Sequence, residues 1–583
     1  MRSFFKIFFA CLLALVVFLF IGFLMVAGVA GSFAAREKPV VSEKSVLQLN
    51  LGDHFREQKE SDPLQQVTGG GSDVPGLYDA VRLIRHAKTD DNISGIYIQA
   101  DGNANGLASS QELRQALLDF KTSGKFVLAY GDMMRQGAYF VASAADKVYI
   151  NPAGDMDWKG FSVELAFFKG MLDKLEIQPQ VFYAGKFKSA TEPFRTDKMT
   201  PENKLQTTVW LSNLYQHFLQ QTAAVRKVDT ATLRQLAETG AVQTPQDALR
   251  YRLVDGLKYD DEVKDELKKR LGLDKKDKIN LLSIGKYEEA ADYKATGKDR
   301  IAVIYAEGNI VDGEGSQDNI GGDRFRKLIR KVRLDESVKA IVLRVNSGGG
   351  SALASENIWR ELAQAKKEKP VVVSFGDVAA SGGYYIACGA DSIFASPNTI
   401  TGSIGVFSLI PNMEGFFRSK AGVTFDGVKT AQYADAGAVY RPLSEAEKSF
   451  MQQGVDRIYL QFKQRVAQGR KKDIAYIDSI AQGRVWNGTD ALRIGLVDRV
   501  GGLQEAVNCA ARLAKADSYR LREYPESPNF LQRLLHKGGS SEPEAQLRQQ
   551  VGEENYKVFR ELVNIRQICG SVQARLPFEY FIK

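Results

Sequence analysis

One stretch of this chain occurs twice. Residues 131–146 read GDMMRQGAYFVASAAD, and residues 376–391 read GDVAASGGYYIACGAD. The two copies also close alike, with QDALRYRLVDGL at 246–257 and TDALRIGLVDRVGGL at 489–503. A repeat of this length indicates two copies of one domain, each with its own hydrophobic core.

The length of the chain agrees with a duplication, because 583 residues are too many for one core. Hydrophobic residues make up 44% and charged residues 25%, which is typical of a globular protein. We predict a first unit at residues 45–285 and a second at 298–515. Residues 516–583 contain proline, GGSS and mixed charge, so we predict a flexible tail there and assign it no function.

The second copy shows the order of its elements. AIVLRVN at 340–346 is typical of a buried parallel strand, and the glycines of NSGGG at 346–350 end it. Residues 354–368 have helical spacing, PVVVSFGD at 370–377 predicts the next strand, and residues 381–390 predict a helix that starts on the serine. This alternation predicts an α/β fold with a parallel sheet, in which ligands bind at the carboxyl ends of the strands.

The first 36 residues predict a membrane anchor. After Arg2 and Lys6, residues 7–35 carry no charge. Residues 7–30 would span roughly 36 Å as a helix, more than the hydrocarbon core of about 30 Å. A cleaved signal peptide is the alternative, but its apolar region is usually only about 7–15 residues long. We predict an uncleaved single-pass helix at 1–36 whose preceding positive charges keep the N-terminus in the cytoplasm. The rest of the chain would then lie on the periplasmic side of a Gram-negative inner membrane.

Composition excludes several classes of function. The net charge of +8 is small for this length and is spread along the chain, so we expect no nucleic-acid partner. None of the four cysteines forms a CxxC pair, and we expect neither a metal site nor a cofactor. No histidine occurs between His217 and His536, so the second unit cannot hold a Ser-His-Asp triad of its own.

Ser381 is the candidate nucleophile. A helix N-terminus that follows a strand supplies backbone N–H donors for an oxyanion, and Gly382 and Gly383 leave room for a substrate. The alternative is that Ser381 only caps the helix. The first unit has Gln136 at the equivalent place, so the fold does not need a capping hydroxyl there.

The NSGGG loop precedes this serine and offers a second oxyanion donor. We expect the N–H of Gly349 to face the N–H of Gly382 across a substrate carbonyl. The first unit has DGNANG instead, a degraded version. Ser347 and Ser351 are rival hydroxyls that we interpret as turn and cap residues, and Ser403 in TGSIGV is expected to line the cleft.

A lysine is the standard alternative base for a serine nucleophile. Burial in an apolar cleft lowers the pKa of a lysine by several units and leaves a usable neutral amine. The candidates are Lys188 and Lys186 in YAGKFKSATEPF and Lys429 in FDGVKTAQY. Taken singly, each is more often a solvated charge.

Several motifs together resemble those of the signal peptide peptidase A family, also called protease IV, in its long duplicated form. They are GDVAASGGYYIA around Ser381, RVNSGGGSALASE, TGSIGV, GKFKSATEPF and the N-terminal anchor. The resemblance covers roughly residues 1–515. It implies tandem Clp protease/crotonase-like α/β domains and a serine protease with a Ser-Lys dyad.

The resemblance also implies roles for single residues. The nucleophile falls on Ser381 and the general base on Lys188, with the backbones of Gly349 and Gly382 as oxyanion donors. Lys429 leaves a dyad within the second unit open. Substrates would be apolar peptides such as cleaved signal peptides, and the protomers would assemble into a homotetramer in contact with membrane lipid.

Two other classes of function remain as alternatives. A crotonase-like enzyme that acts on acyl thioesters would have a similar oxyanion hole, but the N-terminal anchor argues against its usual cytosolic compartment. A membrane-tethered scaffold that binds peptides without cutting them would not need Ser381.

Overall fold

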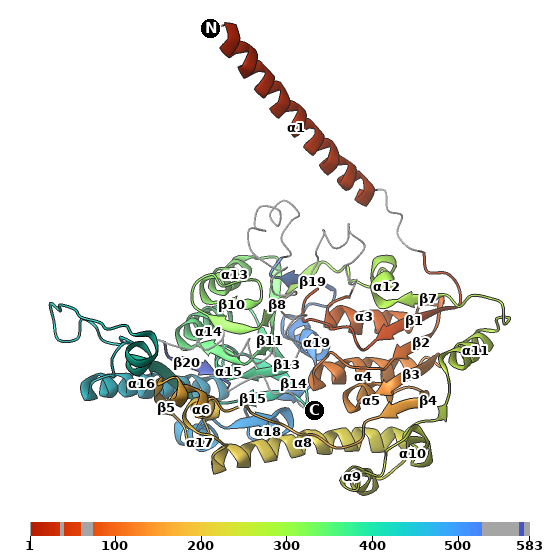
Figure 1. Cartoon of the computed structure of the whole chain (residues 1–583). Helices are drawn as coiled ribbons and strands as arrows, with labels where there is room; N and C mark the ends of the chain where they lie inside the picture. The colour runs from red at the N-terminus through yellow and green to blue at the C-terminus, as the bar shows by residue number, and fades with distance from the viewer. Residues whose placement is uncertain (1, 35–39, 60–73, 527–570, 577–583) are drawn as a thin grey trace.

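The repeat appears in the structure as two β-sheets, one in each unit (Figure 1). The computed structural model describes residues 2–34, 40–59, 74–526 and 571–576. In the first unit, six parallel strands lie in the order β6–β4–β3–β2–β1–β7. Their bounds are Gly256–Leu257, Lys147–Met156, Phe126–Met134, Ile93–Gln99, Ser45–Asn50 and Leu281–Ser283.

The sheet of the second unit follows the same plan. Its main path is β17–β15–β13–β11–β8–β19, with β14 beside β13 and β18 beside β14, and its pairs are parallel except for β15 with β17. The bounds in path order are Val485–Asn487, Ile400–Gly402, Val371–Ala380, Val338–Ser347, Asp299–Glu307 and Tyr519–Tyr524, then Ser392–Ala395 for β14 and Arg499–Val500 for β18. The predicted strands at 340–346 and 370–377 are the central strands β11 and β13, whose apolar side chains are buried.

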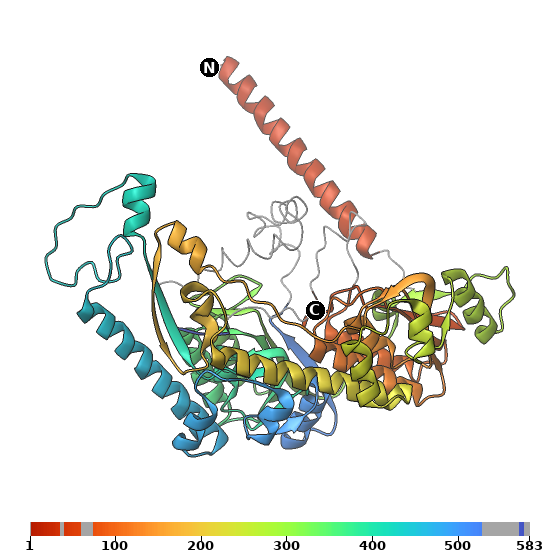
Figure 2. The same cartoon turned by 60° about the horizontal axis from the view of Figure 1, so that its bottom comes forward.

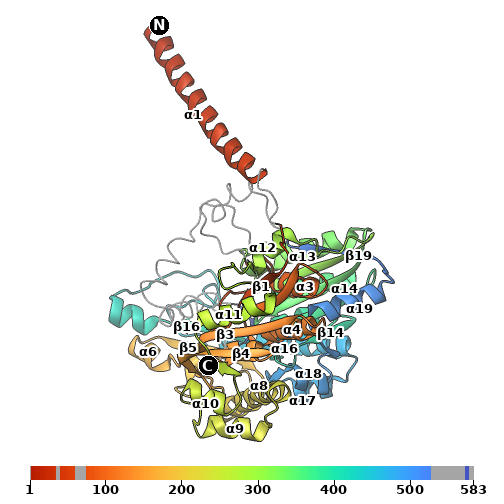
Figure 3. The same cartoon turned by 90° about the vertical axis from the view of Figure 1, so that its right-hand side faces the viewer.

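Helices cover these sheets, and Figure 3 views them from the side of the first unit. Helix α14 begins where the Ser351 hydroxyl accepts a hydrogen bond from the Ala354 N–H, and its apolar face is buried against the sheet. The helices of the first unit are α3 (Leu77–Ala87), α4 (Leu107–Lys121), α5 (Gln136–Ala142), α9 (Thr230–Glu238), α10 (Pro245–Arg250), α11 (Asp260–Leu271) and α12 (Ile284–Ala290). Those of the second are α13 (Gly322–Leu334), α14 (Ala352–Ala365), α15 (Gly382–Ala387), α16 (Glu445–Arg470), α17 (Ile474–Ile480), α18 (Gly488–Arg493) and α19 (Leu503–Leu513).

A third sheet joins strands that are far apart in the sequence, in the order β10–β9–β12–β20–β16–β5. Strand β5 belongs to the predicted first unit, yet it pairs antiparallel with β16 of the second over seven residues (Figure 2). The bounds are Asn319–Gly321, Asn309–Val311, Gly349–Ser351, Gln573–Arg575, Val406–Asn412 and Gln178–Ala184. The segment after β4 therefore leaves its own unit and enters the other, accompanied by α6 (Lys169–Lys174) and α7 (Glu192–Arg195).

Helix α8 (Pro201–Arg226) returns the chain from the second unit to the first and runs along both (Figures 1 and 2). Near its start, Gln206 Oε1 accepts a hydrogen bond of 3.1 Å from the Val485 N–H of the second unit. Its later residues Phe218 and Leu219 are buried in the first-unit core. This long helix holds the crossing segment in place.

A buried ion-pair cluster also ties the units together. Arg344 on β11 lies 2.7 Å from a Glu57 oxygen and 2.6 Å from a Glu112 oxygen, both of which belong to the first unit. Burial raises the pKa of Glu57 to about 7, although the charge of Arg344 opposes this change. Arg344 also donates hydrogen bonds to Ser374 and Phe375 on β13, so the first unit braces the two strands that lead to the glycine loop and to Ser381.

Asp377 makes a second connection between the units, and it supports a stability prediction. Its carboxylate accepts hydrogen bonds from the N–H groups of Ala108 and Ser109, at 2.7 and 3.1 Å, and so caps helix α4 of the other unit.

We expect Asp377→Ala to lower the free energy of unfolding by about 1–2 kcal/mol, with a smaller loss for Asp377→Asn, which keeps an acceptor. Thermal unfolding in detergent measures this, with exposed Asp265→Ala as the control. Equal melting temperatures for Asp377→Ala and the control would contradict the capping role.

The N-terminal segment forms helix α1 (Arg2–Ala34). Its stretch Phe4–Gly22 has a mean hydropathy of 2.9 and none of it is buried, so among the described residues it is long and apolar enough to cross a membrane. This fits the predicted anchor. Residues 519–524 of the predicted flexible tail instead form β19, which pairs with β8 in the central sheet, whereas residues 527–570 and 577–583 lie outside the described part of the chain. The side chains of residues 519–524 alternate between partly buried and exposed positions, a pattern that is typical of a strand.

Candidate active site

Ser381 lies at a sharp corner between β13 and α15, where the sequence placed it. Its φ is 55°, a left-handed conformation that a residue with a Cβ seldom adopts. Its N–H donates to the Gly402 carbonyl at 2.8 Å, and this bond fixes the corner. The predicted helix begins one residue late, at Gly382, and the Ser381 hydroxyl does not cap it. Strain of this kind gathers at functional sites, so the geometry favours a nucleophile over a cap.

Lys188 reaches this serine from the other unit. After β5, the Phe187 N–H donates to the Gln482 carbonyl at 2.8 Å, which holds the crossing segment against the second unit. The amine Nζ of Lys188 then lies 2.9 Å from Ser381 Oγ. The two residues are separated by 193 positions in one chain, and the hydroxyl of one unit meets the amine of the other.

Close backbone contact fixes the position of Lys188. Gly483 has a φ of +75°, and a Cβ there would lie 2.6 Å from the Lys188 backbone nitrogen. Only glycine allows both this conformation and this approach. The site therefore depends on a glycine that the motif analysis did not single out.

The surroundings of Lys188 favour a neutral amine. The residue is 1% exposed, and burial lowers its pKa well below the ordinary 10.5. Among the described residues, the groups within hydrogen-bond distance of its Nζ are neutral: the hydroxyls of Ser381 and Ser403, at 2.9 and 3.0 Å, and the Ser403 carbonyl at 3.3 Å. A neutral lysine in this position can accept the proton of the serine hydroxyl.

This lowered pKa predicts the pH dependence of the site. The amine accepts a proton only when neutral, so the reactivity of Ser381 must rise as pH increases through the pKa of Lys188. We expect the rate of fluorophosphonate labelling at Ser381 to show an ascending limb with its midpoint well below 10.5. A rate that is flat, or that falls with increasing pH across this range, would be incompatible with a lysine base.

The other two lysine candidates do not reach the serine. Lys186 is exposed, and its amine lies 5.3 Å from the centre of the Phe187 ring. The Lys429 side chain is 44% exposed and pairs with Asp435 at 2.7 Å. Of the three, only Lys188 is brought to Ser381, and a dyad within the second unit is not formed.

The glycine loop partly matches the expectation. Gly349 has a positive φ of +97°, and a Cβ on it would lie 2.6 Å from the Gly382 nitrogen, so the two glycines are neighbours, as expected. However, the Gly349 N–H donates to the hydroxyl of Ser347 at 3.1 Å and does not point freely into the cleft. This difference arises because Ser347 accepts from the residue two positions later, a common turn contact.

The rival hydroxyls have the local roles that the sequence suggested, with one addition. Ser347 donates to the Gly308 carbonyl at 2.6 Å, and Ser351 caps α14. Ser403 does more than line the cleft, because its hydroxyl bonds the Lys188 amine. No signal in the sequence identifies this contact, because it forms only when the crossing segment brings Lys188 to TGSIGV, a motif that begins on β15.

The first unit has the same corner between a strand and a helix, but it carries no hydroxyl there. Gln136 begins α5 after β3, as Ser381 precedes α15 after β13. Its side-chain oxygen accepts from the N–H groups of Lys159 and Gly160, and its side-chain nitrogen donates to the Gly160 carbonyl at 2.7 Å. The amide therefore binds the chain's own backbone, which makes this corner structural.

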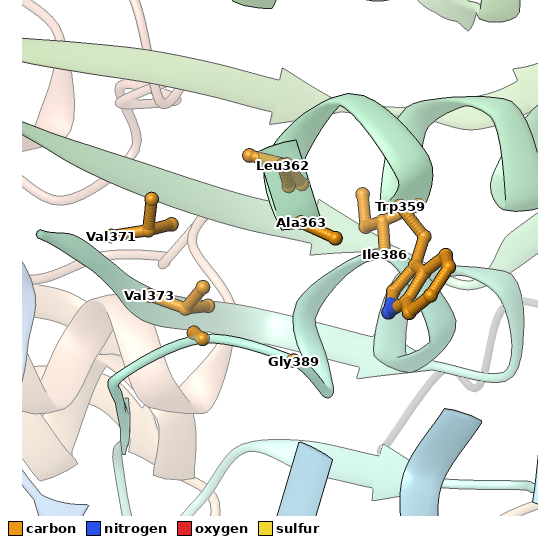
Figure 4. A pocket seen from close by; sticks show the side chains of 8 residues that line it. Trp359, Leu362, Ala363, Val371, Val373, Ile386 and Gly389 are labelled. Atoms are coloured by element: carbon orange, nitrogen blue, oxygen red, sulfur yellow. The ribbon is translucent and has the colours of Figure 1, made fainter. Parts of the chain in front are cut away.

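A small cavity behind α15 is not part of the site (Figure 4). It lies between α14, β13 and α15, and apolar side chains such as Trp359, Val373 and Ile386 line it. Its volume of about 10 Å³ is enough for a single water molecule and not for a peptide.

Comparisons with known proteins all point to one family of peptidases. Residues 119–274 and 363–517 each match Peptidase family S49. Protease 4 of Salmonella typhi is 40% identical over 485 residues, covering 81% of this chain and 78% of that protein. Protease 4 of Haemophilus influenzae is 36% identical over 85% of this chain and 84% of its own, and the chloroplastic serine protease SPPA of Arabidopsis thaliana is 32% identical over 81% and 70%. The family matches once in each half of the chain, which confirms the duplicated α/β architecture.

Proposed function

Because this chain belongs to peptidase family S49 and is a serine peptidase, we propose that Ser381 is its nucleophile and Lys188 its general base. The observation that carries the proposal is the distance of 2.9 Å between Lys188 Nζ and Ser381 Oγ, both of them buried. The low pKa of the amine supports it, since a protonated lysine could not act as a base.

The proposed reaction has two stages. Neutral Lys188 takes the hydroxyl proton as Ser381 Oγ attacks a peptide carbonyl, and backbone N–H groups at Gly382 and Gly349 stabilise the oxyanion. Lys188 then gives this proton to the leaving amine, and the peptide bond breaks. Water, deprotonated by the same amine, attacks the acyl-enzyme, and the amine returns this proton to Ser381 Oγ as the ester bond breaks and the acid is released. The Gly349 N–H must break its hydrogen bond to the Ser347 hydroxyl before it can donate to the oxyanion, so the Gly382 N–H is the better placed donor.

We extend the proposal to substrate and location. The apolar N-terminal helix supports a location at a membrane, where cleaved signal peptides and other apolar peptides would be the substrates. We propose the inner membrane, with both units on the periplasmic side, because Arg2 and Lys6 precede the apolar stretch. A homotetramer is proposed on family resemblance. Light scattering of the detergent-solubilised protein measures this assembly.

A fluorophosphonate probe tests the proposed nucleophile. In the detergent-solubilised full chain, we expect one covalent adduct per chain, which peptide mapping places on Ser381. Synthetic apolar peptides about 20 residues long should slow the labelling, whereas polar peptides of equal length should not. An adduct on another residue, or none in a chain that still cuts peptides, would contradict the assignment.

A further inference from the structure

Gln206 lies near the start of α8, the helix that runs along both units, and its side chain is buried (Figure 2). Its amide nitrogen donates to the Phe187 carbonyl at 3.1 Å and to the Ser189 hydroxyl at 3.2 Å. These two residues stand directly before and after Lys188 in the chain. Gln206 therefore binds both neighbours of the proposed general base.

The oxygen of the same amide faces the second unit. It accepts the N–H of Val485 on β17 at 3.1 Å. Opposite Val485 in the sheet lies Gly402 of β15, whose carbonyl accepts the Ser381 N–H. A backbone N–H can only donate and a backbone carbonyl can only accept, so one orientation of the amide satisfies both Val485 and Phe187. A single side chain thus connects the strands behind the nucleophile to the segment that carries the base.

A buried carboxylate holds the far end of this segment. Glu192 accepts hydrogen bonds from the Thr200 hydroxyl at 2.6 Å and from the side-chain nitrogen of Asn203 at 2.9 Å. The side-chain oxygen of Asn203 in turn accepts a hydrogen bond from the Gln206 amide at 3.2 Å. These contacts attach the segment after β5 to the start of α8 at more than one point.

We propose that Gln206 is a positioning residue for the proposed reaction, because it holds the backbone on both sides of Lys188 and so keeps the amine within hydrogen-bond distance of Ser381. General-base catalysis depends on this distance, and a displacement of about 1 Å can lower a rate by about 10²-fold. This inference rests on the proposed function. It adds a residue that lies outside the motifs around Ser381 and Lys188.

The same contacts keep Lys188 away from water. Burial is the cause of the low pKa of this amine. If the Gln206 amide is removed, the segment is held less firmly, water reaches the amine, and its pKa rises toward the ordinary value. Two quantities then change together: the maximal rate falls, and Ser381 becomes reactive only at a higher pH. A residue that merely stabilises the fold would change neither quantity in the folded enzyme.

The test uses variants of the detergent-solubilised full chain. Gln206→Met keeps the length of the side chain but removes both hydrogen-bonding groups. We expect kcat for an apolar fluorogenic peptide to fall by about 10- to 100-fold at unchanged KM. The midpoint of the pH dependence of fluorophosphonate labelling at Ser381 should move to higher pH. Gln220→Met is the matched control, because this glutamine is exposed on the same helix, and it should leave kcat and the midpoint as in the parent.

A second variant covers the case in which Gln206→Met does not fold. Gln206→Asn keeps both polar groups on a side chain that is one methylene shorter and cannot reach both units, so we expect a smaller loss of kcat with a midpoint moved in the same direction. Thermal unfolding shows which variant is folded at the assay temperature. A parent-like kcat in that variant, or a lower kcat with an unmoved midpoint, would overturn the inference and make Gln206 a structural residue.

Failure of the proposed function gives a different result. In that case labelling of the parent chain shows no ascending limb with pH, and Lys188→Met keeps its turnover. If only the role of Gln206 is wrong, the parent shows the limb, Lys188→Met loses turnover, and the Gln206 variants behave like the Gln220→Met control in both measurements.

Discussion

Replacing Lys188 with methionine should lower kcat/KM for an apolar peptide by about 10²–10⁴-fold, the range that a general base contributes. Methionine fills the same buried space but cannot accept the proton of Ser381. Steady-state assays in detergent measure the loss. Lys429→Met and Lys186→Met are matched controls, because both side chains are exposed and neither reaches the serine. Near-native turnover by Lys188→Met, with a loss in Lys429→Met, would refute a site shared between the units.

The same variant should gain stability at neutral pH. Burial lowers the pKa of Lys188 in the folded chain, whereas in the unfolded chain the amine has its ordinary pKa of about 10.4. At pH values between these two pKa values, the unfolded chain binds more protons than the folded chain. The stability of the parent chain therefore rises with pH in this range. We expect the melting temperature of Lys188→Met to exceed that of the parent at pH 7, with a smaller difference near pH 10. A variant that is less stable at both pH values would show that the lysine is not buried in its neutral form.

Ser381→Ala should abolish measurable turnover, a loss of about 10⁴-fold or more, because no other group can carry the acyl intermediate. The fold should persist, since the hydroxyl does not cap α15. Peptide cleavage and circular dichroism, measured on the same sample, distinguish a loss of turnover from a loss of the fold.

Gln136→Ser is the reciprocal control for this serine. It restores a hydroxyl at the equivalent corner of the first unit, but there the glycine loop is degraded and the side chain at 136 is bonded to Gly160. We expect the double variant Ser381→Ala, Gln136→Ser to remain inactive. Activity in this double variant would mean that the first unit holds a working site of its own.

Much of the fold was predictable because the duplicated core follows simple patterns. Strands β11 and β13 are continuous apolar runs, α14 has helical spacing, and glycines mark the turns between them. The two copies could be compared with each other, and Gln136 at the place of Ser381 indicated that the fold does not need a hydroxyl at this corner. The second unit has no histidine, which favours a lysine as the base.

The parts that were missed depend on contacts between distant segments. Nothing in the apolar run of β5 states that it pairs with β16 of the other unit. The bond between Ser403 and Lys188 follows from that crossing and could not be found before it. Likewise, β20 has only three residues, too few for any periodic signal, and its neighbours are decided by the edges that β12 and β16 leave open.

The crossing of β5 has a consequence for biosynthesis. A chain released halfway through translation carries the amine but not the hydroxyl, and a late fragment carries the hydroxyl but not the amine. On the proposed dyad, hydrolytic competence arises only after both halves have been made and β5 has joined β16. A partly folded chain therefore lacks the proposed dyad, and the pairing of β5 with β16 sets the moment at which the site can form.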